Sequence, residues 1–260
     1  MNTDSLQKRE VFHLAFLRAL ARSVPVSTFV VKGGCNLRFY FGSIRYSEDM
    51  DLDVSGLPVH VLRDKVLAVL NSSGLTDTLR IYGIERVQPP DIARAKQTET
   101  VQRFKIHLFT TAGEDLFTKV EFSRRGFDTP VLAESVSAPI LAAYRMPPLI
   151  VPHYGATAAV RQKIQALVTR RQPEARDVFD LYTLSSRPEV SSPGLAEGLS
   201  SRTILQARER IYSIGYEQYR DTVVSFLGPE DQAAYSSNQF WDEIRLRAIS
   251  TLEHGGRDEE

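Results

Sequence analysis

Apolar residues recur along this chain with two spacings, one typical of helices and one typical of strands. Between residues 5 and 22 they repeat every three or four positions, which predicts an amphipathic helix. Residues 58–70 show the same spacing behind a proline, a residue favoured at helix starts. Short runs rich in β-branched and aromatic residues predict strands. These runs are residues 28–31, 78–86, 100–110 and 116–123.

From residue 155 onward almost every apolar repeat is helical. The expected helices are residues 157–170, 173–185, 201–214, 217–227 and 238–253. Just before them, residues 149–154 predict a short edge strand, because Pro152 lacks the N–H group that a central strand needs. We therefore expect an α/β (α+β) lobe with a mixed sheet over residues 1–145 and a helical lobe over residues 146–260.

Two glycines follow the first predicted strand. Residues 28–31 lead into Lys32, Gly33 and Gly34, and residues 36–40 then predict one or two helical turns. Backbone N–H groups at such a strand-to-helix junction lack partners, and the positive end of the helix dipole lies behind them. The junction is therefore a candidate seat for a triphosphate.

Residues 49–54 alternate acidic and apolar side chains, in the order Asp-Met-Asp-Leu-Asp-Val. Alternation on a strand directs Asp49 and Asp51 to one face, about 7 Å apart, and the apolar residues to the core. Neighbouring carboxylates repel each other, and a divalent cation relieves that repulsion. Together with the phosphate seat, the pair predicts phosphoryl or nucleotidyl transfer assisted by metal ions.

The combination resembles the nucleotidyltransferase signature, in which an apolar residue, Gly, Gly or Ser, and a spacer precede Asp-x-Asp. The longer string Lys-Gly-Gly…Leu…Tyr…Arg-x-Ser-x-Asp-x-Asp, from Lys32 to Asp51, resembles the AbiEii-type nucleotidyltransferase toxins in particular. The resemblance implies a minimal nucleotidyltransferase fold for the first lobe, with Asp49 and Asp51 as catalytic metal ligands. It also implies a nucleotide-binding set: Lys32, Gly33, Gly34, Arg45 and Ser47.

A third carboxylate is expected on the predicted strand 116–123, where Lys119, Glu121 and Ser123 share one face. Nucleotidyltransferases usually keep an acid on a late strand, so the resemblance implies Glu121 as a further metal ligand. The alternative is a solvated strand face on which Lys119 pairs with Glu121.

The helical lobe contains a second match to the same family. Residues 163–167 resemble its Lys-x-x-Ala-Leu helix, and residues 176–181 resemble its Arg/Lys-Asp-x-x-Asp-Leu helix. The resemblance implies that Lys163 binds the nucleotide phosphates during catalysis, and that Asp177 orients this lysine or acts on the incoming hydroxyl. Asp180 is an additional candidate. From the residues alone, a solvated acidic pair three positions apart on a helix is the favoured interpretation.

The segment around Lys163 is strongly basic. Residues 161–176 hold an excess of four positive charges, which suits the backbone of a polynucleotide. The alternative is that these cations serve intramolecular pairs with Glu174, Asp177 and Asp180. Lys163 itself lies at the edge of a buried helical stripe, so we expect Lys163→Ala to weaken nucleotide use without changing thermal stability.

The composition is that of an ordinary globular protein, with 42% hydrophobic and 25% charged residues among 260. The 32 basic and 32 acidic residues cancel, which argues against a surface covered with nucleic-acid-binding charge but permits a local patch. A single cysteine, Cys35, excludes an intramolecular disulfide and fits a reducing cytosol. No apolar run approaches the ~18 residues of a membrane span, and no signal pattern is present. We expect a cytoplasmic protein without membrane partners.

The resemblance implies a metal-dependent nucleotidyltransferase that acts as a bacterial toxin. Asp49 and Asp51 would hold two Mg²⁺ (or Mn²⁺) ions around an NTP substrate, and pyrophosphate would leave. Some toxins of this type extend tRNA, so we expect an RNA acceptor, the 3′ end of tRNA, and a cognate antitoxin protein as partner. Two alternatives stay open: nucleotide transfer to a protein or small-molecule hydroxyl, and a non-catalytic binding module of the same fold. The intact Asp-x-Asp and Lys163 favour an enzyme.

Overall fold

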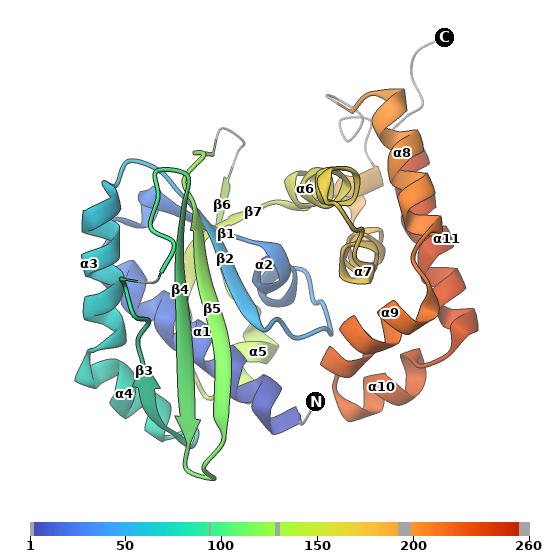
Figure 1. The fold of residues 1–260 in the computed structure, drawn as a ribbon. Coiled ribbons are helices and arrows are strands. Elements are labelled where there is room, and N and C mark those ends of the chain that lie inside the picture. Colours follow the sequence, from blue (N-terminus) through green and yellow to red (C-terminus); the bar gives the residue numbers. More distant parts are fainter. Residues whose placement is uncertain (1–2, 94, 128–130, 192–198, 255–260) are drawn as a thin grey trace. The chain divides into compact units, whose positions relative to one another are not determined.

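The structure, a computed structural model, describes residues 3–93, 95–127, 131–191 and 199–254. The chain forms two compact units, which are described separately (Figure 1). The first contains the residues up to Tyr40 together with Tyr46–Tyr154, and the second contains Phe41–Arg45 and the chain from Gly155 onward. The short segment Phe41–Arg45 thus belongs to the second unit although both of its neighbours in sequence belong to the first.

A mixed sheet runs through the first unit. Its strands among the described residues are β1 (Phe29–Lys32), β2 (Asp49–Val54), β3 (Ile84–Gln88), β4 (Val101–Thr110), β5 (Asp115–Ser123), β6 (Val131–Ser135) and β7 (Ile150–Tyr154). They lie in the order β3-β4-β5-β2-β1-β7-β6. Strands β2 and β5 pair in parallel, as do β1 and β7, and the other neighbours are antiparallel. The predicted α/β class with a mixed sheet is confirmed.

One face of the sheet carries the core of this unit. Helices α1 (Thr3–Ser23), α3 (Val59–Leu70) and α4 (Ser73–Arg80) contribute to it, and Figure 1 shows α3 and α4 together beside the sheet. Alternate apolar residues of β2, β4 and β5 pack in the same core: Met50, Leu52, Phe104, Ile106, Leu108, Val120 and Phe122. Asp49 and Asp51 alternate with Met50 and Leu52, so they point to the other face. Two shorter helices, α2 (Gly33–Tyr40) and α5 (Ala138–Ala143), complete the unit.

The strand predicted at residues 78–86 is wrong. Those residues form the end of α4, a turn and the start of β3. The Ser72 hydroxyl accepts a hydrogen bond from the Leu75 N–H and caps α4, and Gly83 then turns the chain with φ 75°. A local cap therefore outweighed the β-branched composition of the run.

The edge position predicted for residues 149–154 is also wrong. Strand β7 lies inside the sheet, because β6, which no sequence pattern predicted, pairs with it along its whole length. The missing N–H of Pro152 is compatible with this position because β7 pairs with β1 only at Val31 and His153. Residues 150–154 therefore belong to the sheet of the first unit.

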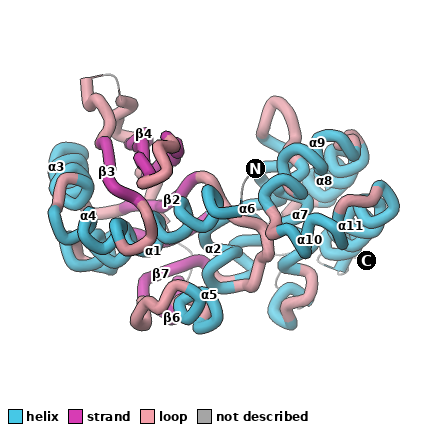
Figure 2. The backbone as a smooth tube through the Cα atoms, turned by 90° about the horizontal axis from the view of Figure 1, so that it is seen from below, coloured by secondary structure: helices cyan, strands magenta, loops and turns pink. Residues whose placement is uncertain are grey.

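The second unit is helical (Figure 2). Its helices among the described residues are α6 (Ala156–Thr169), α7 (Ala175–Leu184), α8 (Ser201–Tyr212), α9 (Tyr216–Thr222), α10 (Pro229–Tyr235) and α11 (Asn238–His254), with 3-10 turns at Pro188–Ser191 and Val224–Phe226. Of these, α10 was not predicted. The buried Trp241 stacks on Tyr219 with ring centroids 4.5 Å apart, and its indole N–H donates to the carbonyl of Ile214. None of the described helices combines the length and the apolar character that a membrane crossing needs.

A buried polar network supports the start of β2. The Thr118 hydroxyl donates to the carbonyl of Glu48 (2.7 Å), so its oxygen accepts from Nε2 of His13 (2.9 Å). On the other side of the ring, the Cys35 thiol lies 3.6 Å from Nδ1 of His13 and 3.4 Å from the carbonyl of Asp49. Burial lowers the pKa of His13 to about 3, so the ring is neutral in the folded protein.

This network predicts a pH-dependent stability. Between the ordinary pKa of 6.5 and the folded value of about 3, the unfolded chain protonates His13 and the folded chain does not. The free energy of unfolding therefore falls as the pH falls through this window, by an amount on the order of a few kcal/mol. His13→Gln should make urea unfolding less dependent on pH between about pH 7 and about pH 4. His60→Gln on α3, where the side chain is exposed, is the matched control. An unchanged pH dependence in His13→Gln would contradict the assignment.

Candidate active site

The approach of Gly33 to Asp51 defines the centre of the first unit's candidate site. Strand β1 passes directly into α2 at Gly33, three residues earlier than the sequence predicted, and Gly33 has φ 67°. A Cβ atom at this position would lie 2.9 Å from Oδ2 of Asp51. Both the left-handed backbone and the close contact therefore require glycine. The first residue of α2 consequently lies beside the carboxylate of Asp51.

Strand register brings further charged residues around Asp51. On β1 its partner is Lys32, and on β5 its partner is Glu121, while Asp49 is the partner of Lys119. The ammonium of Lys119 lies 3.0 Å from Oδ2 of Asp49 and 3.9 Å from Oε2 of Glu121. Arg103 on β4 donates to Glu121 at 2.6 Å. The structure thus gathers all three predicted carboxylates on one sheet face. Two of them are already paired with cations there, Asp49 with Lys119 and Glu121 with Arg103.

Asp51 differs from its neighbours because it makes no hydrogen bond or ion pair with the described residues. Burial raises the pKa of Asp51; Lys119 and Lys32 oppose the increase, whereas Glu121 and Asp49 add to it. A carboxylate in this situation gains from a nearby cation that can compensate its charge.

The donor set fits a divalent cation held by Asp49 and Asp51, with the remaining ligands supplied by a nucleotide. Among the residues that the structure describes, no group of three or more His, Cys, Asp or Glu is arranged to hold a metal ion. Glu121 is engaged by Arg103, and its role as a metal ligand stays a prediction.

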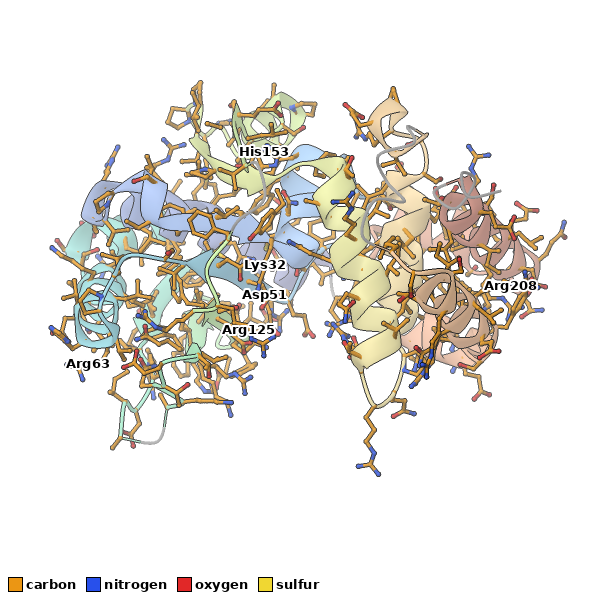
Figure 3. The ribbon with its side chains drawn as sticks, turned by 90° about the horizontal axis from the view of Figure 1, so that it is seen from above. Lys32, Asp51, Arg63, Arg125, His153 and Arg208 are labelled. Atoms are coloured by element: carbon orange, nitrogen blue, oxygen red, sulfur yellow. The ribbon has the colours of Figure 1, made fainter. Side chains whose placement is uncertain are left out.

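The third acid of the alternating run has a structural partner. Oδ1 of Asp53 lies 2.5 Å from the ammonium of Lys32, and Oδ2 accepts a hydrogen bond from the Tyr154 hydroxyl at 2.6 Å. Figure 3 shows Lys32 and Asp51 close together on the sheet. The Ser47 hydroxyl donates to the carbonyl of Asp49 at 2.8 Å, which fastens the turn before β2. Lys32 and Ser47 therefore lie close to Asp51 and Asp49. Lys32 pairs with Asp53, and Ser47 fastens the turn before β2.

The second unit carries a buried ion cluster around Lys163 of α6. Its ammonium lies 2.6 Å from Oδ2 of Asp180 and 3.1 Å from Oδ1 of Asp177, both on α7 and both without exposed surface. Arg45 binds the other oxygen of Asp180 at 3.1 Å, and Arg170 lies 3.2 Å from Oδ2 of Asp177. Every member of the cluster thus contacts an opposite charge.

The pKa values of Lys163 and Asp180 are both shifted in the direction that favours their charged forms. Burial alone would lower the pKa of Lys163, but Asp180 and Asp177 outweigh it and the pKa is raised. Burial alone would raise the pKa of Asp180, but Arg45 and Lys163 outweigh it and the pKa is lowered. The lysine is therefore held charged and fixed in position. Arg45, predicted at the nucleotide, belongs to this cluster through Asp180, a contact that no sequence spacing indicates.

Two expectations from the sequence are revised. Lys163 lies at the edge of the buried stripe of α6, as expected. Its removal would, however, take one partner from each of two buried carboxylates, so an unchanged thermal stability is not expected. The basic segment around it is also largely compensated: Arg170 and Arg176 both pair with Glu174, and Arg170 pairs with Asp177 as well. Intramolecular pairing therefore accounts for most of the charge excess in residues 161–176.

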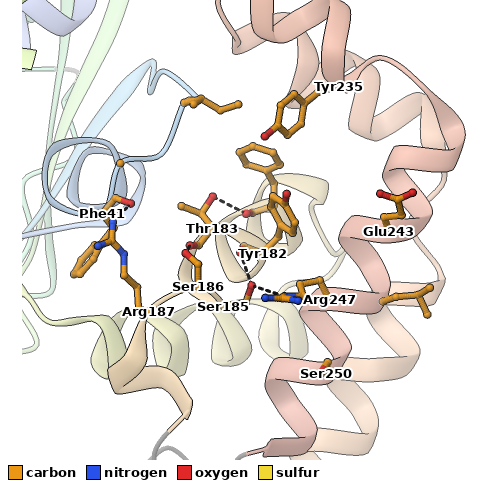
Figure 4. Close-up of a pocket in the computed structure, with 14 residues that line it drawn as sticks. Phe41, Tyr182, Thr183, Ser185, Ser186, Arg187, Tyr235, Glu243, Arg247 and Ser250 are labelled. Atoms are coloured by element: carbon orange, nitrogen blue, oxygen red, sulfur yellow. Dashed lines mark hydrogen bonds between the residues drawn. The ribbon is translucent and has the colours of Figure 1, made fainter. Parts of the chain in front are cut away.

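A cavity of about 800 Å³ lies in the second unit near the C-terminal end of α7 (Figure 4). Aromatic and hydroxyl side chains line it together with Arg187 and Arg247, and Arg247 donates to the Ser185 hydroxyl. None of the predicted site residues lines this cavity. Its walls show no cluster of groups suited to metal binding or proton transfer, so it is not part of the candidate active site.

Comparison with known proteins finds one family and several similar solved structures. A family model described as "Nucleotidyl transferase AbiEii toxin, Type IV TA system" matches residues 15–239. Among solved structures, MenT4, a nucleotidyltransferase toxin from Mycobacterium tuberculosis H37Rv, superposes with TM-score 0.61 at 18% identity, covering 97% of this chain and 86% of that one. No curated protein matches this chain.

Two structures from Helicobacter pylori are also similar. A protein assigned as a nucleotidyltransferase gives TM-score 0.56 at 19% identity, covering 97% of this chain and 95% of that one. JHP933 gives TM-score 0.54 at 20% identity, covering 97% and 92%. At such identities these structures establish the common fold.

The ion cluster predicts a strong energetic coupling between Lys163 and Asp180. Lys163→Met and Asp180→Asn should each lower the free energy of unfolding by about 3 kcal/mol, because each removes one of the opposite charges that compensate a buried charge. The double variant should lose clearly less than the sum of the two. Urea unfolding of the four proteins measures this coupling. Strictly additive losses would show that the two side chains do not interact.

The sheet face predicts a metal site at Asp49 and Asp51. Asp51→Asn should leave the melting temperature nearly unchanged, abolish tight Mn²⁺ binding in the presence of a non-hydrolysable NTP, and reduce transfer by several orders of magnitude, since metal charge stabilisation contributes several kcal/mol. Mn²⁺ titration followed by electron paramagnetic resonance gives the binding. Asp77→Asn, an exposed position on α4, is the control. Retained Mn²⁺ binding in Asp51→Asn would exclude this residue as a ligand.

Proposed function

Because the chain belongs to the AbiEii nucleotidyltransferase toxin family, we propose that it transfers nucleotides from an NTP to the 3′ end of an RNA, and specifically of tRNA, with Mg²⁺ or Mn²⁺ as cofactor. Membership makes the chain a nucleotidyltransferase toxin, with NTP and an antitoxin as partners. The observation that carries the metal-dependent step is the contact between Gly33 and Asp51, which joins a helix N-terminus to an unpartnered carboxylate.

The first unit supplies the groups for triphosphate and metal. The N–H groups of Gly33 and Gly34 bind the β- and γ-phosphates at the start of α2. Asp49 and Asp51 hold the divalent cation, with Glu121 as a further carboxylate on the same face. When bound, this cation neutralises phosphate charge and lowers the pKa of the acceptor hydroxyl. The acceptor oxygen forms a bond to the α-phosphorus, the bond to the β-phosphate oxygen breaks, and pyrophosphate leaves while the hydroxyl proton is lost.

The second unit supplies a fixed positive charge. Lys163 binds the nucleotide phosphates and offsets the charge of the leaving pyrophosphate. Asp177 and Asp180 hold its ammonium at 3.1 and 2.6 Å, so little conformational freedom is lost when phosphate binds. Arg45 adds a second cation to the same cluster through Asp180.

Two observations support an RNA acceptor: the family, and a positive charge in the basic segment that intramolecular ion pairs do not compensate. Within residues 161–176, Arg171 is exposed and has no ion pair with any described residue. Toxins of this type extend tRNA in some cases, and growth arrest in the cytoplasm is the expected consequence. Transfer to a protein hydroxyl is a distinct outcome of the experiment below.

The acceptor is identified by incubating the protein with each α-labelled NTP, total RNA and lysate protein. We expect label in the tRNA fraction with the wild-type protein and none with Asp51→Asn. Periodate oxidation of the RNA destroys the terminal 3′ diol, so it should abolish labelling. Label in the protein fraction would contradict the proposal. Undiminished labelling of periodate-treated RNA would contradict the 3′ end as acceptor.

A further inference from the structure

The sheet face that carries Asp49 and Asp51 continues across β5 and β4 as an accessible surface. On both strands, fully buried residues alternate with exposed or half-buried ones, and the accessible set shares a face with the two acids. Phe117 on β5 is 41% exposed and lies on this accessible face.

Strand register aligns this surface into successive rows. The row of Asp49 continues through Lys119 on β5 to Lys105 on β4. The next row pairs Phe117 with His107. The row after it contains Asp115 on β5, Phe109 on β4 and Arg86 on β3, and the carboxylate of Asp115 lies 2.9 Å from Nδ1 of His107. A strip therefore leads from the candidate metal ligands to β3, and it is defined here as Lys105, Phe117, His107, Phe109 and Arg86.

The strip presents neighbouring aromatic rings, which are edge-to-face between His107 and Phe117 and nearly parallel between His107 and Phe109. The ring centroids of His107 and Phe117 are 5.6 Å apart, and those of His107 and Phe109 are 6.5 Å apart. The guanidinium of Arg86 lies 3.8 Å from the centroid of Phe109. Phe117 and Arg86 are exposed, and His107 and Phe109 are half-buried. Accessible rings and guanidinium planes on a sheet are the groups on which unpaired nucleotide bases stack.

The first row of the strip places two like charges directly opposite each other. Lys105 and Lys119 are cross-strand partners, an arrangement that destabilises an antiparallel pair. Lys119 is compensated by Asp49, whereas Lys105 is exposed and has no ion pair within the described part of the chain. An anion bound at this row would remove the repulsion.

We propose that this strip binds the single-stranded end of the acceptor RNA. The inference rests on the proposed RNA acceptor and locates it on the molecule. Bases stack on Phe117, His107 and Phe109, and a backbone phosphate binds at Lys105. The row of Lys105 is also the row of Asp49, so the terminal hydroxyl is directed toward the metal ligands. The rows are about 7 Å apart, and their number suits two or three nucleotides, as on other sheet surfaces that bind single strands.

Two substitutions test the strip by direct binding. The probe is a 5′-fluorescein single-stranded RNA of about ten nucleotides, and its dissociation constant is measured by anisotropy at several salt concentrations. Phe117→Ala should weaken binding at least about fivefold, since one stacking surface is lost. Lys105→Ala should also lower the slope of log Kd against log salt by about 0.7, the value for one phosphate contact on a single strand. In the transfer assay the KM for RNA should rise and the KM for NTP should not.

The controls are exposed residues of the same types outside the strip. Ile81→Ala and Lys65→Ala should bind the probe like the wild-type protein. Melting temperatures close to that of the wild type show that the variants are folded. A blunt RNA duplex of the same sequence should bind much more weakly than the single strand.

The outcomes separate the strip from the proposed function. If the wild-type protein labels RNA and both variants bind the probe unchanged, the strip is wrong and the function stands. If the wild-type protein labels only protein, RNA is not the acceptor. If, in that case, the variants also bind the probe like the wild-type protein, the strip is not an RNA-binding surface either. Equal affinity for the duplex overturns the strip. Variants that bind RNA normally but escape neutralisation by the cognate antitoxin would make this face a protein interface and overturn it as well.

Discussion

The contact between Gly33 and the carboxylate of Asp51 is the constraint on which the first unit's site depends. It requires β1 and β2 to pair in one register, since Lys32 must be opposite Asp51 for the next residue to reach that carboxylate. A shift of one residue would turn Asp49 and Asp51 into the apolar core and Met50 and Leu52 out of it. The core on the other face of β2 therefore fixes the register, and the register fixes the distance between Gly33 and the carboxylate of Asp51.

Local patterns predicted the parts of this site that lie within single elements. The alternation of residues 49–54 gives the strand, its buried face and its acidic face, because each is decided by neighbours two positions apart. The Gly-Gly pair gives the strand-to-helix junction for a similar reason. The amphipathic patterns gave most of the helices, and only their ends moved, as for the helix expected at residues 217–227.

Contacts between distant segments were not accessible in the same way. The pair of Arg45 with Asp180 joins residues that are 135 positions apart, and no spacing rule connects them. Strand β6 has no alternation of its own, since all five of its residues are exposed, and it is a strand because β7 offers it a free edge. The like-charged partners Lys105 and Lys119 become visible only when the register of β4 and β5 is known. These features depend on tertiary pairing, which single-sequence patterns do not encode.

The two groups of acids differ in how readily their cations can be exchanged. Asp49 and Lys119 are both partly exposed, and an ion pair of this kind contributes little net stability, so a divalent cation can replace the lysine at small cost. The side chains of Asp177 and Asp180 have no exposed surface, so removing Lys163 from them would strongly destabilise the folded protein. The same pairing of lysine with aspartate therefore serves opposite purposes. On the sheet the pairing is exchangeable, as the proposed metal site requires, and in the helical unit it holds a positive charge in place.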